Sequence, residues 1–328
     1  MILILTDPGT RVGIANHMIE INTGDLIRKL PLHVLESVSV FGSIQLSARF
    51  IQHCLIHEIP IMYFSYTGQY FGRISSQSGQ DLEYLQAQLT MINNTEFRQN
   101  LAAAILEAKI NNQMIVLKRS NVNHLLDRDI SFLSKIRKKI NAQLSINEQI
   151  GHEGIAARVY FAAVSKILPK EFKFANRSKR PPRDPFNSMI SLGYTILLHE
   201  MIGQIEGVGL SAYGGLVHGN SRKYPSLASD MIEEYRPTLV DSMVISLLKS
   251  RTVSREDFDI SAEGVFLSKE LLRKYLDQLH KKMMTKHKYL PYMEKEVSYR
   301  ETIYHQAKRM RSAIWQQDAA IYEPIRIR

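Results

Sequence analysis

The sequence predicts an α+β protein in which a small, mainly β N-terminal domain (residues 1–80) precedes a larger all-α helical domain (residues 81–328). Two observations support this fold class. In the first part of the chain, short β-rich segments alternate with turn residues. Residues 81–150, by contrast, contain no proline or glycine and place apolar side chains at helical spacing. The length of 328 residues also fits about two domains.

The elements follow in order from these patterns. The apolar residues Leu46, Phe50 and Cys54 recur at helical spacing and predict one helix over 45–57, with Ser43 as its candidate N-cap. Strands are predicted over residues 1–5, 11–15, 18–21, 34–41 and 60–66. Beyond the helical stretch 81–150, helices are predicted over residues 155–168, 186–205, 232–248, 269–284 and 297–317.

Composition narrows the classes of partner and compartment. The chain carries 42 Lys and Arg against 32 Asp and Glu, a net charge of +10, which favours a polyanion such as nucleic acid over a membrane. Cys54 is the only cysteine, so no internal disulfide can form, as is typical of a reducing cytoplasm. The apolar N-terminus reads as a first strand rather than a signal peptide. No apolar run approaches the length of a membrane span, and we expect a cytoplasmic protein with no membrane partner.

A histidine pair in the predicted N-terminal helix has the spacing of a zinc motif. His53 and His57 are four residues apart and share one helix face. The motif requires a glutamate directly after the first histidine, and Cys54 stands there instead. We therefore favour packing roles for both histidines over metal binding.

Glu153 is the first candidate for chemistry in the helical domain. It precedes an apolar stripe at helical spacing formed by Ala156, Val159, Ala163 and Ile167, and it lies on the same face. A carboxylate on a core-facing stripe is costly unless it is paired or bound to a metal. The alternative is a first-turn carboxylate favoured by the helix dipole.

Two further segments offer candidate ligands. Seven of the 17 glycines lie within residues 193–219, and His218 ends this glycine-dense loop, which indicates either tight turns or close approach of the backbone to a ligand. Asp230 and Glu233 are three residues apart and share a helix face, although they also fit a capping box with Asp230 as N-cap. Glu234 projects about 100° away and is expected to be solvated or paired with an arginine. Pro237 indicates a kink or an early position in a helical turn.

Together, Glu153, His218 and a carboxylate at 230 or 233 supply two carboxylates and one imidazole. This donor set suits an octahedral divalent ion that keeps open water positions, such as Mg²⁺ or Mn²⁺.

The order of four motifs resembles a known family. The segments GHEGIAARVYF, RDPFNSMISLGYTILLHEM, GGLVHG and SLASDMIEEYRP occur in this order over residues 151–241. They resemble the CRISPR-associated integrase of spacer acquisition, the first Cas protein. The chain departs from the family at Ser211 and Ala212, where Asp-Pro is frequent, and at Val217, where Leu is usual. These changes affect the loop and none of the candidate ligands.

The resemblance implies a catalytic Mg²⁺ or Mn²⁺ held by Glu153, His218 and Glu233, with Asp230 and Asn187 close to the ligands. It implies a metal-dependent DNA endonuclease and integrase that inserts short foreign DNA into a CRISPR array by attack of a 3′-hydroxyl on a phosphodiester. The implied partners are double-stranded DNA (spacer precursor and CRISPR repeat), a second copy of this chain joined through the β domain, and a dimer of the second Cas protein.

Basic residues that flank the motifs are the candidate DNA contacts, and about half of them are expected to be solvated surface charges instead. These candidates are Arg158, Arg177, Lys179, Arg180, Arg183, Arg222 and Lys223. Two other functions stay open: a metal-free nucleic-acid-binding scaffold, and a subunit that serves assembly while a partner carries the activity.

Overall fold

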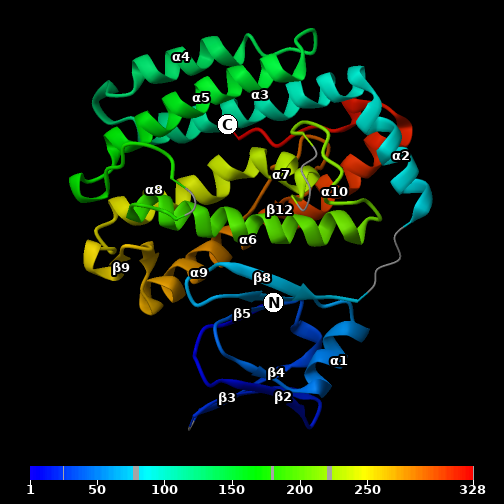
Figure 1. The fold of residues 1–328 in the computed structure, drawn as a ribbon, viewed down its shortest axis with the longest axis vertical. Helices are drawn as coiled ribbons and strands as arrows, with labels where there is room; N and C mark the ends of the chain where they lie inside the picture. The colour runs from blue at the N-terminus through cyan, green and yellow to red at the C-terminus, as the bar shows by residue number, and fades with distance from the viewer. Residues whose placement is uncertain (25, 77–80, 179–180, 220–223, 328) are drawn as a thin grey trace. The chain divides into compact units, whose positions relative to one another are not determined.

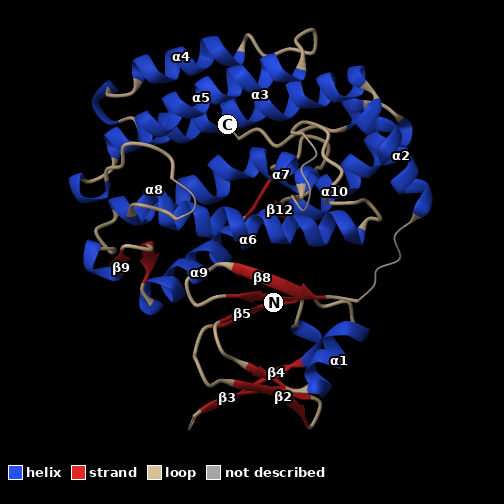
Figure 2. Cartoon of the chain, viewed as in Figure 1, coloured by secondary structure: helices blue, strands red, loops and turns tan. Residues whose placement is uncertain are grey.

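The computed structural model describes residues 1–24, 26–76, 81–178, 181–219 and 224–327 (Figure 1). By its internal contacts the chain divides into two compact units, residues 1–78 with 266–280 and residues 79–265 with 281–328. The first unit is rich in strands and the second is mostly helical (Figure 2). The predicted α+β class, with a β-rich N-terminal part and a helical remainder, is confirmed.

Two four-stranded sheets and one helix build the N-terminal unit. The first sheet has the order β1 (Ile2–Leu5), β5 (Ser37–Phe41), β7 (Ile61–Phe64) and β8 (Tyr70–Ile74). The second has the order β4 (Leu26–Pro31), β3 (Met18–Thr23), β2 (Arg11–Ala15) and β6 (Gln45–Leu46). Strands β5 and β7 pair in parallel, whereas β2, β3 and β4 form an antiparallel meander.

The core of this unit lies between its two sheets. Val38 and Val40 come from one sheet, Ile19 from the other, and Phe50 and Cys54 from helix α1 (Ala48–Ile56); all are fully buried. Strands β4 and β8 were not predicted, because β4 is largely exposed and neither segment alternates strongly between apolar and polar residues.

Helix α1 begins later than its sequence pattern suggested. Its N-cap is Ser47, whose hydroxyl accepts a hydrogen bond from the backbone N–H of Phe50 at 3.2 Å. The prediction of Ser43 was wrong because Gln45 and Leu46 form strand β6 against β2 before the helix starts.

Helices dominate the second unit. Those near the candidate residues are α2 (Leu82–Asn93), α3 (Thr95–Ser120), α4 (Asp127–Arg137), α5 (Ile146–Ile167), α6 (Pro185–Gly207), α7 (Ser226–Met231), α8 (Ser242–Lys249) and α10 (Tyr299–Gln316). A 3₁₀ turn, η4 (Ile232–Glu234), and a π-helical turn, η5 (Arg236–Asp241), join α7 to α8. Pro237 occupies an early position of that π-helical turn.

Shorter elements complete the chain. Strands β9 (Phe258–Ser261) and β10 (Gly264–Leu267) form one two-stranded sheet, and β11 (Lys286–His287) and β12 (Val297–Ser298) form another. Helix α9 (Lys269–Met284) starts in the segment 266–280, which belongs to the first compact unit. None of the helices among the described residues is long and apolar enough to cross a membrane.

The helices α3, α4 and α5 pack against one another, and α6 packs against α7 and α10 (Figure 1). Helix α3 also contacts η4 and η5, so it links the first group to the segment that follows α7. Helix α5 is capped by a reciprocal pair in which Ser145 and Glu148 bond each other's backbone N–H groups. That cap places the start of α5 nine residues before the predicted start at 155.

Candidate functional site

The location of two helix starts decides two of the alternatives drawn from the sequence. Because α5 begins at Ile146, Glu153 lies in the interior of the helix and not in its first turn, so the dipole explanation was wrong. Because α7 begins at Ser226, Asp230 lies inside that helix and cannot be an N-cap for Glu233. The capping-box alternative was therefore also wrong.

Asp230 instead organises the loop that carries His218. Its carboxylate is fully buried and accepts hydrogen bonds from the backbone N–H groups of Leu216 (2.9 Å), Val217 (2.9 Å) and His218 (3.1 Å). It also accepts one from Nδ1 of the His218 ring at 2.6 Å. This contact assigns the ring proton to Nδ1 and leaves the lone pair of Nε2 available to a ligand. The same hydrogen bond raises the pKa of His218 above its usual value, against the opposing effect of burial.

The other two predicted ligands meet on one cation. Lys109, from α3, is a buried lysine whose Nζ contacts Oε1 of Glu153 and lies 2.6 Å from Oε2 of Glu233. The side chains of Glu153 and Glu233 are 13% and 4% exposed, so both carboxylates are largely removed from water. Two carboxylates from separate helical segments therefore share one positive charge.

Arg236 supplies a second positive charge to this cluster. Its guanidinium lies 2.6 Å from Oε1 of Glu233, one turn along the chain. Burial alone would raise the pKa of Glu233, but the charges of Arg236 and Lys109 outweigh it and lower that pKa to about 2. Glu233 is thus held ionised at any physiological pH.

Arg236 packs against a cluster of aromatic and charged side chains centred on Tyr194. The Arg236 guanidinium lies 5.0 Å from the centre of the Tyr194 ring, and Arg177 lies 5.6 Å from the same ring. The Tyr194 hydroxyl donates to Asp241 at 2.5 Å, and Tyr160 donates to the same carboxylate at 2.9 Å. Burial raises the pKa of Asp241 to about 6, although these two hydrogen bonds act against the rise.

Asn187 has a structural role in the neighbouring segment. Its backbone N–H bonds the cap residue Asp184 at 2.8 Å, and its side chain donates to Asp184 and to the carbonyl oxygen of Asn176. Its Oδ1 accepts from Arg177 at 2.7 Å. These contacts tie the start of α6 to the preceding segment and hold Arg177 beneath Tyr194.

Whether these residues fit a divalent ion can be tested on their contacts. Among the described residues, no group of three His, Cys, Asp or Glu side chains already has the arrangement of a metal site. The cluster nevertheless has the right donors. Lys109 Nζ stands as a cation between Glu153 and Glu233, and Oε2 of Glu233 accepts no well-aligned hydrogen bond in the described part of the chain. The donor set therefore fits a hard cation.

Glu234 is the clearest correction to the sequence analysis. It was expected to be solvated or paired with an arginine, but it is fully buried. Its carboxylate accepts hydrogen bonds from Tyr322, Gln306 and the backbone N–H of Ile325. Burial raises its pKa to about 7, against the effect of these donors. The expectation failed because those partners lie 72 to 91 residues further along the chain.

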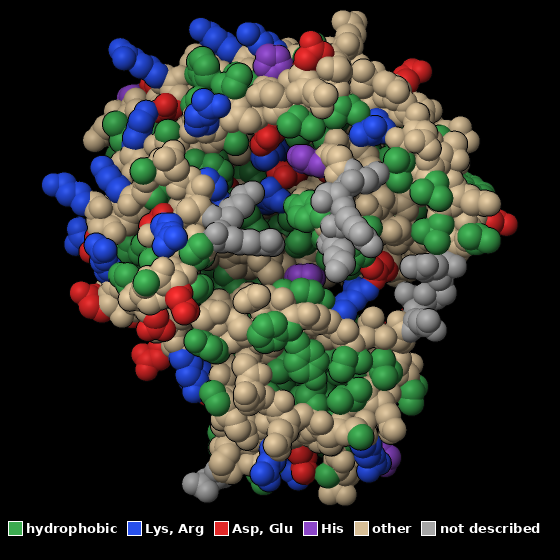
Figure 3. Space-filling view, in the orientation of Figure 1, with side chains coloured by type: hydrophobic (Ala, Val, Ile, Leu, Met, Phe, Trp, Pro, Cys, Tyr) green, Lys and Arg blue, Asp and Glu red, His purple; other side chains and the backbone are tan. Residues whose placement is uncertain are grey.

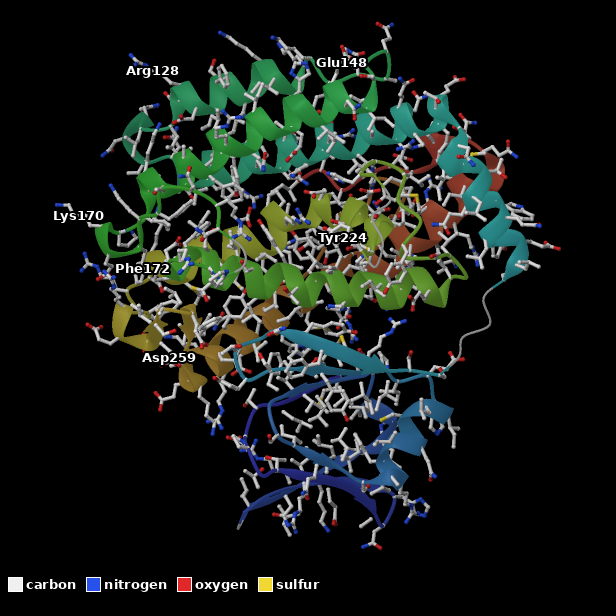
Figure 4. All side chains as sticks on the ribbon, viewed as in Figure 1. Arg128, Glu148, Lys170, Phe172, Tyr224 and Asp259 are labelled. Carbon is white, nitrogen blue, oxygen red and sulfur yellow. The ribbon has the colours of Figure 1, made fainter. Side chains whose placement is uncertain are left out.

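The candidate DNA contacts separate into three groups. Arg158 and Arg183 are exposed, whereas the Arg177 guanidinium is committed to Asn187 and Ser191. Lys179, Arg180, Arg222 and Lys223 lie outside the described residues. Figure 3 shows further Lys and Arg side chains projecting from the part of the helical unit that contains α4 and α5. Arg128 on α4 and Lys170, which follows α5, point outward there (Figure 4).

Sequence reasoning missed two residues that hold the cluster together. Lys109 continues an apolar stripe of Leu101 and Ile105 at a spacing of four, so a buried lysine was detectable by the same argument that singled out Glu153. Gln88, on α2, bonds the loop at Ser211 and Gly214, which lie 123 and 126 residues away. A single glutamine on a helix gives no such signal.

Comparison with known proteins decides the family. The sequence profile described as CRISPR associated protein Cas1 matches residues 3–281. The chain belongs to the Cas1 family. A CRISPR-associated endonuclease Cas1 of Thermus thermophilus is 32% identical over 284 residues, which cover 87% of this chain and 84% of that protein.

Solved structures of the Cas1 family share the fold. A Cas1 protein from Thermotoga maritima has a TM-score of 0.81 and 22% identity, covering 96% of this chain and 97% of that one. A chain of a Cas6-RT-Cas1–Cas2 complex has a TM-score of 0.83 and 27% identity. That match covers 99% of this chain but 36% of the longer one, so it concerns one part of that chain. The family suggested by the four ordered motifs is thus confirmed.

Proposed function

We propose that this Cas1-family chain is a divalent-metal-dependent DNA endonuclease and integrase that inserts short foreign DNA into a CRISPR array. In the reaction, the 3′-hydroxyl of the incoming DNA forms a bond to phosphorus as the bond to a repeat-strand oxygen breaks. The attacking hydroxyl loses its proton, and the departing oxygen gains one.

The observation that carries the proposal is the meeting of Glu153 and Glu233 on one positive charge. Both carboxylates are largely buried and face Lys109 Nζ from separate helical segments. Carboxylate oxygens that converge from separate segments are the ligands that a hard divalent ion prefers. We assign Glu153, His218 and Glu233 as the residues that hold Mg²⁺ or Mn²⁺.

Each side chain has a separate task in this proposal. Arg236 keeps Glu233 ionised, and Asp230 holds the His218 ring proton on Nδ1 so that Nε2 faces a ligand as a free lone pair. Glu153 contributes the second carboxylate from the rigid interior of α5. When bound there, a divalent ion would supply Lewis-acid polarisation of the scissile phosphate and compensate the negative charge that develops on the phosphate oxygens.

We further propose DNA and the second Cas protein as partners, together with a second copy of this chain. The net charge of +10 supports binding to DNA. A similar chain is part of a complex named for Cas1 and Cas2, which supports that partnership. If several basic groups neutralise phosphates, the logarithm of the DNA association constant should fall linearly with the logarithm of the salt concentration. The slope should be about −0.7 to −0.9 for each phosphate contacted. A flat salt dependence contradicts the DNA part of the proposal, and a dilution-resistant monomer in light scattering contradicts the dimer.

The decisive experiment is strand transfer of a short duplex with free 3′-hydroxyls into a plasmid that carries a CRISPR repeat. We expect product in Mg²⁺ or Mn²⁺ and none in a chelator. The variants Glu153→Gln, His218→Ala and Glu233→Gln should each lose product while keeping most DNA affinity. Glu83→Gln, an exposed carboxylate on α2, is the matched control and should behave as the wild type.

Other outcomes identify the alternatives. Metal-independent DNA binding with no product from any protein, including the wild type, favours the scaffold. Product that appears only after the second Cas protein is added, and is unaffected by the three substitutions, places the activity in the partner.

A further inference from the structure

A buried hydrogen-bond network surrounds the residue that follows Glu233 in the chain. That residue, Glu234, is fully buried. Its carboxylate accepts from Tyr322 Oη at 2.6 Å, from Gln306 Nε2 at 3.2 Å and from the backbone N–H of Ile325. A carboxylate that accepts this many hydrogen bonds in the interior is fixed in one orientation.

The backbone of Glu234 is linked to the same segment through Asn112 of helix α3. Nδ2 of Asn112 donates to the carbonyl oxygen of Glu234 at 2.9 Å and to that of Ile325 at 2.8 Å. Oδ1 of Asn112 accepts from the N–H of Ile327 at 3.0 Å. We define residues 322–327 as the C-terminal strap, because Tyr322 and Ile325 bond the Glu234 carboxylate directly. Asn112 bridges the strap to the carbonyl oxygen of Glu234.

Helix α3 connects the strap to the carboxylate cluster. Lys109 and Asn112 are three residues apart on α3 and so lie on neighbouring positions of one helix face. Lys109 contacts Glu233, and Asn112 contacts the backbone of Glu234. The pair Glu233–Glu234 is therefore clamped, with the first carboxylate facing the cation and the second facing the strap.

We propose that Glu234 and the C-terminal strap position Glu233 for metal binding. This inference rests on the proposed function, because it concerns the orientation of one of the three assigned ligands. The Glu234 carboxylate is bonded to Tyr322, Gln306 and Ile325, so it acts through the backbone that carries Glu233. A short 3₁₀ turn such as η4 has few hydrogen bonds of its own, which is why outside contacts are needed to fix it.

The test is titration of Mn²⁺ by calorimetry into the wild type and four variants. Tyr322→Phe removes one hydrogen bond to Glu234, and Glu234→Ala removes all those to its side chain. Groups that orient a metal ligand typically change metal affinity about 10–100-fold, so we expect Glu234→Ala to weaken Mn²⁺ binding by about that factor. Tyr322→Phe should weaken it by a smaller factor. Glu233→Gln, the ligand variant, should abolish binding.

The matched control is Glu323→Gln, whose side chain pairs with Arg309 on the exposed side of the same strap. It should bind Mn²⁺ as the wild type does. In strand transfer, Tyr322→Phe should raise the half-saturating Mn²⁺ concentration and leave the rate at saturation nearly unchanged. A merely structural defect lowers the folded fraction and the amplitude of the reaction without moving that concentration.

The outcomes separate this inference from the function on which it rests. If the wild type binds no Mn²⁺, or Glu233→Gln binds it as tightly, the proposed function fails. If the wild type binds and Glu233→Gln does not, but Tyr322→Phe and Glu234→Ala bind like Glu323→Gln, the strap has no positioning role. Should Glu234→Ala not fold, Tyr322→Phe decides the question alone, since it loses a single hydroxyl.

Discussion

Gln88 anchors the loop that leads to His218, and its removal should have a measurable cost. Nε2 of this buried side chain donates to the carbonyl oxygens of Ser211 and Gly214, both at 2.9 Å, and Oε1 accepts from the N–H of Ser211 at 2.8 Å. Each hydrogen bond contributes about 1 kcal/mol net, so Gln88→Ala should lower the free energy of unfolding by about 3 kcal/mol. For a unit of this size that is a melting-temperature decrease of about 6–12 °C.

The assay is thermal unfolding by calorimetry, with Gln86→Ala as the matched control. Gln86 lies on the same helix but is exposed, so its replacement should leave the melting temperature close to that of the wild type. If Gln88→Ala melts together with Gln86→Ala, the loop is held by other contacts and the reasoning fails.

A double-mutant cycle sharpens the test. A Cβ added at Gly214 would lie 2.6 Å from Gln88 Nε2, so Gly214→Ala in the wild type must displace that amide and lose its hydrogen bonds. In the Gln88→Ala background the clash with the amide is absent. The second substitution should therefore be less destabilising there than in the wild type, and strict additivity of the two effects would contradict the contact.

Three further predictions follow from buried ionisable groups. Lys109→Met leaves two buried carboxylates short of one positive charge and should lower the free energy of unfolding by about 3–5 kcal/mol in urea denaturation, whereas the exposed Lys118→Met on the same helix should not. Burial raises the pKa of Asp241 to about 6 from 3.8, so the folded state binds the proton more tightly than the unfolded chain does. The wild type should therefore lose about 3 kcal/mol relative to Asp241→Asn as the pH rises from about 4 to 6, and parallel curves for the two proteins would refute this sign. Burial also raises the pKa of the Cys54 thiol to about 11, so iodoacetamide at pH 8 should label it only in denaturant, and full labelling of the native protein would exclude a closed core.

Local patterns predicted the helical remainder and, as candidate ligands, Glu153, His218 and a carboxylate at 230 or 233, because periodicity is a property of short segments. The family resemblance selected Glu233. Neither predicted the surroundings of those residues. Glu234 was expected to be solvated or paired with an arginine, and its actual partners, Tyr322 and Ile325, come from a distant part of the chain that no local pattern reveals.

Element boundaries failed for a related physical reason. A serine before an apolar run is a good cap, but which serine serves depends on strand pairing, as at Ser47. The start of α5 was placed too late because Gly151 and Gly154 weaken the local helical signal, while packing against α3 overrides that weakness. Candidate ligands can thus be predicted from a sequence more easily than the hydrogen bonds and ion pairs that orient their side chains.

Asp230 has a consequence for how freely the loop before His218 can vary in sequence. Three of the four hydrogen bonds that this carboxylate accepts come from main-chain amides, which every residue except proline can donate. Positions 216 and 217 are therefore required only to be apolar enough for burial, and the valine found at 217 meets that requirement. Asp230 cannot vary in this way, since its Oδ1 also accepts the hydrogen bond from the His218 ring. A loop taken from another family member should keep this geometry whenever it supplies the histidine and three backbone N–H donors. A substitution of Asp230, by contrast, should disturb both the loop backbone and the orientation of the His218 ring.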